Sequence, residues 1–328
     1  MSVEHEAWLK LIPEEPLEPE LPICDPHHHQ WDRPDDRYFV EDFLRDAAGN
    51  NVVQTVCIEC GAMYRKDGPR EMKPVGEIEF LQNLTGKLPG KTKIGAGYVG
   101  FADLTLGSGV VPVLEAEIAA AKGRFRGIRH IVTWDASPDI RSSAKFKGLA
   151  YDPKFREGFA CLKRYNLTFD SWQYFTQLQD IADLARAFPD TTIVVDHLGG
   201  VVGAGPYAGK KDEVFQKWKK GMKDLAACPN TVLKVGGLGM PRTGFGWDTQ
   251  PKPPSSAQLA KDSAPYIDPC IEMFGVKRCM FESNFPPDKA SFSYTACWNS
   301  FKLLTKGYSK SEKAALFHDT AVRVYRLA

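Results

Sequence analysis

The sequence predicts a single (β/α)8 barrel, and three observations support this fold class. Short apolar runs alternate along the chain with longer segments of helical period. There are eight such pairs, which is the number that closes a barrel. No change of composition divides the 328 residues, of which 43% are hydrophobic and 25% are charged. We therefore predict one barrel domain over residues 21–328, preceded by an arm at residues 1–20.

The strands are expected where apolar residues run without alternation, as in parallel strands that are covered on both faces. Ile193-Val194-Val195 is one such run. The predicted strands are 21–25, 51–58, 92–98, 127–133, 167–171, 191–196, 230–235 and 278–282. The alternative fold is an open, doubly wound sheet. That fold normally has a glycine-rich phosphate turn after its first strand, where this chain has histidines.

Helices are expected between these strands, where apolar residues recur three or four positions apart, as at Val111, Leu114 and Ile118. The predicted helices are 39–48, 75–88, 111–121, 153–165, 178–188, 211–226, 256–274 and 294–305, with a closing helix at 309–326. The arm at residues 1–20 is acidic and rich in proline, which opposes helix formation. We expect it to lie extended over the body or over a neighbouring subunit, an arrangement that a homodimer would allow.

The composition of the chain limits the classes of partner that it can bind. A formal net charge of +1 leaves no basic excess to neutralise phosphates, which argues against nucleic acid or an anionic membrane surface. No apolar stretch reaches the roughly 20 residues of a spanning helix, and the N-terminus lacks a secretion signal pattern. We expect a cytoplasmic protein that acts on a small molecule. Its eight cysteines, including the Cys57–Cys60 pair, are expected to be thiols.

Histidines gather where a barrel places its functional groups, at the carboxyl ends of the strands. Five of the seven histidines lie at predicted strand ends. His27 and His29 share one face of the first strand, because alternate side chains point the same way. His197 follows the sixth strand. Neutral imidazoles that meet in this way can hold one cation or act in acid–base chemistry.

Other polar residues follow the same rule. Glu59 ends the second predicted strand and Glu282 the eighth, while Arg129 and His130 belong to the fourth. Lys234 lies inside an apolar strand and must meet a carboxylate or a substrate oxygen, because burial of an unpaired ammonium is costly. The expected ion-pair partner is Glu59 or Glu282. The tryptophans of the predicted mouth loops are candidates for an apolar wall against a ring: Trp31, Trp134 and Trp172.

Five motifs, in order, resemble those of the amidohydrolase superfamily and of its lactonase-like, amidohydrolase-related branch. They are Asp25-x-His27-x-His29-x-Trp31, Gly127-Ile-Arg-His130, Asp196-His-Leu-Gly-Gly200, Lys234-Val-Gly-Gly-Leu238 and Met280-Phe-Glu-Ser-Asn-Phe-Pro286. The resemblance runs from about residue 22 to residue 326.

This resemblance implies a distorted barrel with a polar site at its mouth. It also implies one divalent metal ion, commonly zinc, although some lactonases of the branch work without a metal. His27, His29 and His197 match the metal-binding histidines. Arg129 and His130 match a segment that binds the substrate's carboxylate or carbonyl.

The chain departs from the family pattern at the eighth strand. The family usually has Gly-Ser-Asp-Trp-Pro, and this chain has Glu282-Ser283-Asn284-Phe285-Pro286. An asparagine amide cannot accept a proton from water, so we assign Asn284 to substrate binding only. We hypothesise that Glu282 supplies the missing carboxylate, and Glu59 is the competing candidate.

The resulting functional prediction is a hydrolase that acts on a lactone, or a related ester or amide, of a small carboxylated compound. Arg129 and Lys234 would pair with a carboxylate or with the developing oxyanion. Trp31 and Trp172 would border the substrate. Two alternatives remain open: a metal-dependent decarboxylase of an aromatic or unsaturated acid, and a metal-free or non-catalytic barrel.

Overall fold

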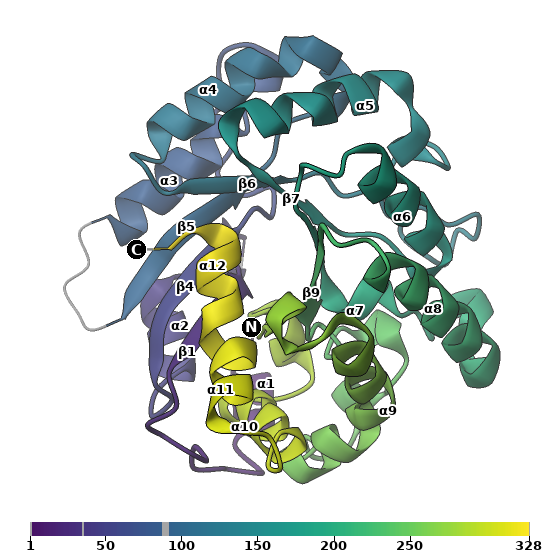
Figure 1. Ribbon diagram of the computed structural model, residues 1–328. Coiled ribbons are helices and arrows are strands. Elements are labelled where there is room, and N and C mark those ends of the chain that lie inside the picture. Colours follow the sequence, from purple (N-terminus) through teal and green to yellow (C-terminus); the bar gives the residue numbers. More distant parts are fainter. Residues whose placement is uncertain (1, 35, 87–91, 328) are drawn as a thin grey trace.

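Eight parallel strands form a nearly closed barrel with helices outside it (Figure 1), which confirms the predicted fold class. The computed structural model describes residues 2–34, 36–86 and 92–327. In spatial order the strands are β1 (Ile23–His28), β4 (Val52–Ile58), β5 (Lys93–Gly100), β6 (Phe125–Arg129), β7 (Thr168–Ser171), β8 (Ile193–Val195), β9 (Thr231–Val235) and β10 (Cys279–Phe281). The barrel closes just past β10, where the backbone N–H of His29 donates to the carbonyl of Phe285 at 2.8 Å.

The helices match the predicted segments. They are α2 (Val40–Asp46), α3 (Val75–Thr85), α4 (Val111–Ala120), α5 (Pro153–Ala160), α6 (Leu178–Ala187), α8 (Lys211–Ala226), α9 (Ser256–Phe274) and α10 (Tyr294–Leu304). A short α7 (His197–Gly200) follows β8, and a hairpin of β2 (Trp31–Arg33) and β3 (Asp36–Tyr38) follows β1. The predicted last helix is divided into α11 (Lys310–Ala314) and α12 (Thr320–Tyr325) by a π-helical turn. The end of the predicted helix 75–88 lies outside the described residues.

The arm contradicts the prediction in one part. Residues Val3–Leu9 form helix α1, whose first turn is capped by the Ser2 side chain. The first proline of the arm is Pro13, so nothing at positions 3–9 prevents a helix. The remainder of the arm packs on α10, where Asn299 Nδ2 donates to Glu14 Oε2 at 3.0 Å.

The C-terminal residues plug one end of the barrel. Small strand residues inside the barrel, such as Val56 and Val194, pack with Val324 and Tyr325 of α12. The guanidinium of Arg326 donates to the carbonyl of Arg126, the second residue of β6, at 3.2 Å. The plug therefore lies at the end where the strands begin, and the opposite end is left for the site.

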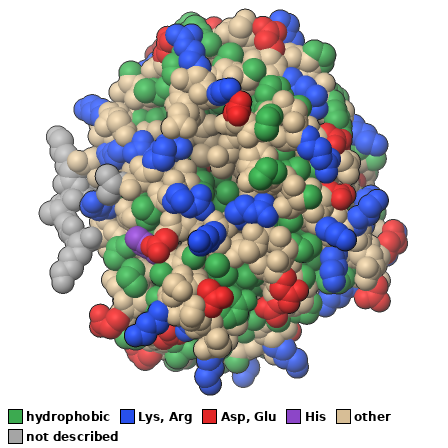
Figure 2. Space-filling model, in the orientation of Figure 1, with side chains coloured by type: hydrophobic (Ala, Val, Ile, Leu, Met, Phe, Trp, Pro, Cys, Tyr) green, Lys and Arg blue, Asp and Glu red, His purple; other side chains and the backbone are tan. Residues whose placement is uncertain are grey.

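The described residues show a mixed surface, buried histidines and free thiols. Lys and Arg side chains are spread among acidic and apolar ones on the face drawn in Figure 2, where little histidine is visible. Five histidines (27, 28, 29, 130 and 197) are buried. All eight cysteines are free thiols, as predicted. No described helix combines the length and the apolar character needed to cross a bilayer.

Phe281 connects the barrel wall to the helices around it. Its ring stacks on Phe301 of α10 at a centroid distance of 4.3 Å and lies 4.8 Å from Phe317. We expect Phe281→Ala to lower the free energy of unfolding by about 3–5 kcal/mol, because a large buried ring leaves a cavity. Urea denaturation measures the loss. Leu303→Ala, at an exposed position of the same α10, is the control and should change stability little.

Candidate active site

The end of the first strand brings His27, and His29 just after it, to the barrel interior. The rings of His27 and His29 lie 4.9 Å apart, and their Nε2 atoms are 3.2 Å from each other. The intervening His28 points away, bonds Thr55 Oγ1 at 2.8 Å and stacks on Phe43. The structure therefore brings His27 and His29 together on one face, as the alternation of a strand requires.

His197 joins them from the turn after β8. Its ring centroid lies 4.5 Å from that of His27, and Trp172 packs edge-on against it at 4.7 Å. Gly237 makes room for this ring, because a Cβ at that position would lie 2.5 Å from His197 Nδ1. Gly237 also has a φ of +72°, a backbone conformation that residues with a side chain rarely adopt.

Glu282 connects His27 with His197. Its Oε1 accepts from His197 Nδ1 at 2.8 Å, and its Oε2 lies 3.0 Å from His27 Nδ1. The Nδ1 of His29 makes its own bond, 2.9 Å from the carbonyl of Ile58. Each of the three imidazoles thus has an oxygen beside Nδ1, which is the usual way in which proteins orient histidine ligands.

His27, His29 and His197 are the predicted metal ligands, and their geometry differs in detail from this prediction. Within the described residues, the set whose possible ligand atoms all lie within 4.8 Å of one another is His27, His197 and Glu282. His29 is attached to this set only through its 3.2 Å contact with His27. Burial lowers the pKa of all three histidines, so the rings are neutral and able to bind a cation.

Lys234 has different partners from those predicted. Its ammonium lies 2.6 Å from Asp170 Oδ2 and 3.1 Å from Asp196 Oδ1, rather than on Glu59 or Glu282. Although burial lowers the pKa of Lys234, the two aspartates more than offset this effect and raise it. The ammonium also lies 3.0 Å from His27 Nδ1. Asp170 and Asp196 were not predicted as site residues, although an aspartate in an apolar strand was a usable signal.

Arg129 connects the histidines to Glu59. Its Nε donates to Glu59 Oε1 at 2.7 Å, its Nη2 donates to the Glu59 carbonyl, and its Nη1 lies 3.3 Å from His27 Nε2. His130 lies apart from this group. Its ring packs between Phe101 and Phe155, and its Nδ1 accepts from the backbone N–H of Leu104 at 3.2 Å.

The remaining predicted residues, Asn284, Trp31 and Trp134, have contacts of their own. The Asn284 amide donates to Asp288 Oδ1 at 2.6 Å, so this amide is occupied within the protein. Trp31 belongs to the β2–β3 hairpin, where Arg33 stacks over its ring. The ring centroids of Trp31 and His29 are 6.2 Å apart. Trp134 is half-buried beneath Lys147.

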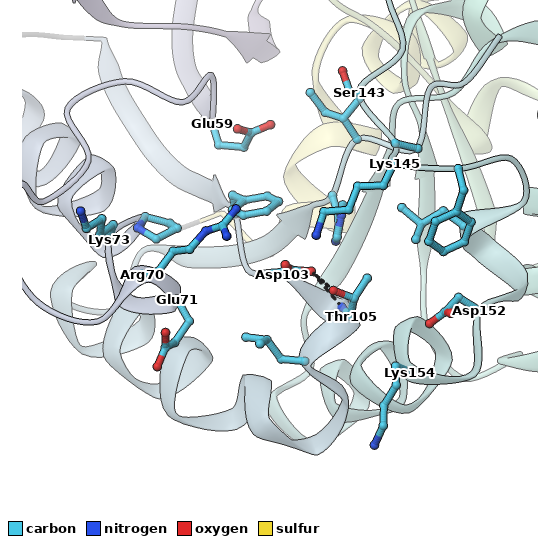
Figure 3. A pocket seen from close by; sticks show the side chains of 18 of the residues that line it. Glu59, Arg70, Glu71, Lys73, Asp103, Thr105, Ser143, Lys145, Asp152 and Lys154 are labelled. Atoms are coloured by element: carbon cyan, nitrogen blue, oxygen red, sulfur yellow. Dashed lines mark hydrogen bonds between the residues drawn. The ribbon is translucent and has the colours of Figure 1, made fainter. Parts of the chain in front are cut away.

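A cavity of about 1000 Å³ opens beside the histidines. Glu59 and His130 line it, while His27, His29 and His197 are not among its lining residues. The carboxylate of Glu59 faces this cavity (Figure 3). Glu59 and Arg129 thus form a series of contacts between the cavity and His27.

The charges of the site suit a divalent cation. Four buried carboxylates (Glu59, Asp170, Asp196 and Glu282) surround two buried cations, Arg129 and Lys234. In the ionised state this leaves two negative charges uncompensated. Oδ2 of Asp196 accepts no hydrogen bond and lies 3.8 Å from Arg129 Nη1. Because unpaired buried charge is costly, one divalent ion near His27 would neutralise the excess, and the residues present fit such an ion.

Removal of the Lys234 charge should destabilise the folded protein strongly. We expect Lys234→Met to lower the free energy of unfolding by about 3–5 kcal/mol, because Asp170 and Asp196 would lose their buried counterion. The matched control is Lys163→Met, which breaks the Lys163–Asp190 pair at the same distance of 2.6 Å, but on the surface. Denaturation of both variants should show a large loss for the first and a small one for the second. Equal losses would contradict the role of burial.

Glu77 should make stability depend on pH. Its Oε1 accepts from the backbone N–H of Cys60 at 2.8 Å, and burial, followed by the charge of Glu59, raises the pKa of Glu77 to about 8. In an unfolded chain glutamate titrates near 4.3, so the folded state holds a proton that the unfolded chain releases. The stability contributed by Glu77 is therefore present at low pH and is lost as pH rises from about 5 to 8.

Glu77→Gln keeps the acceptor oxygen and removes this titration. We expect the variant to become progressively more stable relative to the parent protein between pH 5 and pH 8, as measured by urea denaturation at each pH. Glu79→Gln, at a half-exposed ion pair with Arg65, is the control and should lack this trend. A stability difference that is constant over the range would show that Glu77 does not hold the proton.

Comparisons with known proteins identify the relatives of this chain. An uncharacterised protein of Sinorhizobium fredii, y4mH, is 33% identical over 94% of this chain and 99% of its own length. An L-fucono-1,5-lactonase of Burkholderia multivorans is 26% identical over 71% of this chain and 72% of its own. A zinc-bound crystal structure of a Burkholderia multivorans amidohydrolase covers 93% of this chain and 99% of its own, with a TM-score of 0.72 and 22% identity. A family model described as Amidohydrolase matches residues 91–327, and the chain therefore belongs to the amidohydrolase family.

Proposed function

We propose that this protein hydrolyses a lactone, or a related ester, of a small carboxylated compound with the help of one divalent metal ion. The observation that carries the proposal is the convergence of three neutral imidazoles and Glu282 beside a cavity that reaches Glu59. Family membership supports a hydrolase. The lactone is suggested by the names of relatives such as the L-fucono-1,5-lactonase.

In this proposal His27, His29 and His197 hold the ion. When bound, the ion would polarise the scissile carbonyl or lower the pKa of a bound water. Glu282 acts behind the ligands: it is fully buried and holds Nδ1 of both His27 and His197, so it orients the two rings. Lys234 is fixed by two aspartates and stabilises this carboxylate-rich layer.

Glu59 is the better placed of the two candidate bases. It reaches the cavity, whereas Glu282 has no exposed surface. A general base must come within hydrogen-bond reach of the attacking water, and only a side chain at the cavity meets that condition. Arg129 holds Glu59 in place, and its positive charge would stabilise negative charge on the substrate.

Two substitutions separate the roles of the glutamates. We expect Glu59→Gln to lower kcat by about 100-fold or more while the metal content is kept, since it removes a proton acceptor. We expect Glu282→Gln to lower metal affinity by about 10- to 100-fold, since it removes the group that orients two ligands. Activity is measured on a panel of sugar-acid and carboxylated lactones, and metal by elemental analysis after dialysis.

Glu71→Gln is the matched control, because Glu71 lines the same cavity but points away from it in Figure 3. Full activity of Glu59→Gln would remove Glu59 from the role of base. Normal metal retention in Glu282→Gln would contradict its orienting role. If the parent protein hydrolyses no lactone of the panel, the proposed reaction fails.

One observation favours a second candidate, a hydrolase that needs no metal. Arg129 Nη1 and Lys234 Nζ lie 3.3 and 3.0 Å from the two ring nitrogens of His27, where cations compete with a metal ion. In that case Arg129 and Lys234 would supply the positive charge that stabilises the oxyanion. Activity that survives dialysis against a chelator, in protein with no measurable metal, would favour this candidate.

A further inference from the structure

The cavity beside Glu59 has walls from two long loops. One loop connects β4 to α3 and contributes Arg70, and the other connects β6 to α5 and contributes Lys145. Apolar side chains form much of the remaining wall, including Phe101, Leu106 and Phe146. Leu106 and Phe146 are 38% and 43% exposed, which leaves an apolar surface free to cover a ring.

The acidic side chains of the cavity are already engaged or point elsewhere. Glu59 accepts from Arg129 at 2.7 Å. Asp103 accepts from the backbone N–H of Thr105, and Asp152 caps helix α5 at the N–H of Phe155. Glu71 extends away from the cavity in Figure 3. Glu59, Asp103 and Asp152 are thus bonded to donors of the protein, and Asp103 lies between Arg70 and Lys145 in the view of Figure 3.

Two of the cationic side chains are available. Lys154 is paired with Glu157 at 2.8 Å, and Lys73 points away from the cavity (Figure 3). Arg70 and Lys145 extend into the cavity from opposite walls in the same view. Neither makes an ion pair or a side-chain hydrogen bond with any part of the chain that the structure describes. Two unpaired cations that converge over an apolar surface form a recognition site for an anion on a ring.

We propose that Arg70 and Lys145 bind a carboxylate of the substrate, and that the substrate is an acid whose ring lies on Phe101, Leu106 and Phe146. The position of the reacting bond near Glu59 rests on the proposed function, but binding of the acid does not. An arginine fork and a flexible ammonium together match the two oxygens of one carboxylate. A neutral lactone of the same size would leave both cations without a partner.

The test measures binding rather than turnover. The probe is isophthalate, an aromatic ring with two carboxylates, and its neutral analogue isophthalamide. Calorimetry gives the Kd of each for the parent protein and for Arg70→Gln, Lys145→Gln and Lys154→Gln. We expect Arg70→Gln and Lys145→Gln each to weaken isophthalate binding by about tenfold, a typical loss for one charge-assisted contact. Lys154→Gln should bind as the parent does, because its ammonium is held by Glu157.

Arg70, Lys145 and Lys154 are all exposed, so the variants should fold normally, which circular dichroism checks. The proposal is overturned if the parent protein does not bind isophthalate at millimolar concentration, if isophthalamide binds equally well, or if both variants bind like the parent. Loss of binding in the variants, together with no hydrolysis of any lactone, would keep the acid site and reject the proposed reaction. Hydrolysis of a lactone, together with isophthalate binding that neither variant weakens, would support the proposed reaction and reject the acid site.

Discussion

The buried ion network around Lys234 is the interaction on which the rest of the structure depends. Lys234 on β9 contacts Asp170 on β7 and Asp196 after β8, and Glu282 after β10 reaches His27 on β1. The desolvation of such groups is costly unless each finds its partner. A shift of one residue in any of these strands would turn its charged side chain to the opposite face. The network therefore fixes the register of the barrel, in addition to forming the floor of the site.

The same network connects the site to the closed end of the barrel. The Tyr325 hydroxyl of the C-terminal plug donates to Asp170 Oδ2 at 2.6 Å, and that oxygen also accepts from Lys234. The Lys234 ammonium lies 3.0 Å from His27 Nδ1, and Nε2 of the same ring lies 3.3 Å from Arg129 Nη1. Polar groups thus run in an unbroken series from the plug to the edge of the cavity. Tyr325 of the plug is therefore connected to His27 by three contacts, through Asp170 and Lys234.

The fold was predictable because its signals are local. Unalternating apolar runs such as Ile193-Val194-Val195 report burial on both faces, and the spacing in α8 reports a helix, so each element could be found from its own residues. The partners of Lys234 could not be found in this way, because they depend on which strand ends meet across the barrel. Helix α1 was missed because the prolines from Pro13 onward were taken to describe the whole arm. Arg70 and Lys145 lie in irregular loops, where no periodicity shows which way a side chain points.

Under the proposed function, the change of sequence at the eighth strand accounts for the two glutamates of the site. The family pattern has an aspartate at the position of Asn284, where a carboxylate could both bind a metal and accept a proton. Here the equivalent Asn284 donates to Asp288, and the carboxylate two residues earlier, Glu282, lies between His27 and His197. A carboxylate held by two imidazoles in a fully buried position can orient ligands, but it cannot reach a water in the cavity. Proton transfer then requires a second carboxylate at the cavity wall, and Glu59, fixed by Arg129, meets that requirement. Under the proposed function, the two roles of one aspartate are thus divided between two residues from opposite ends of the sequence.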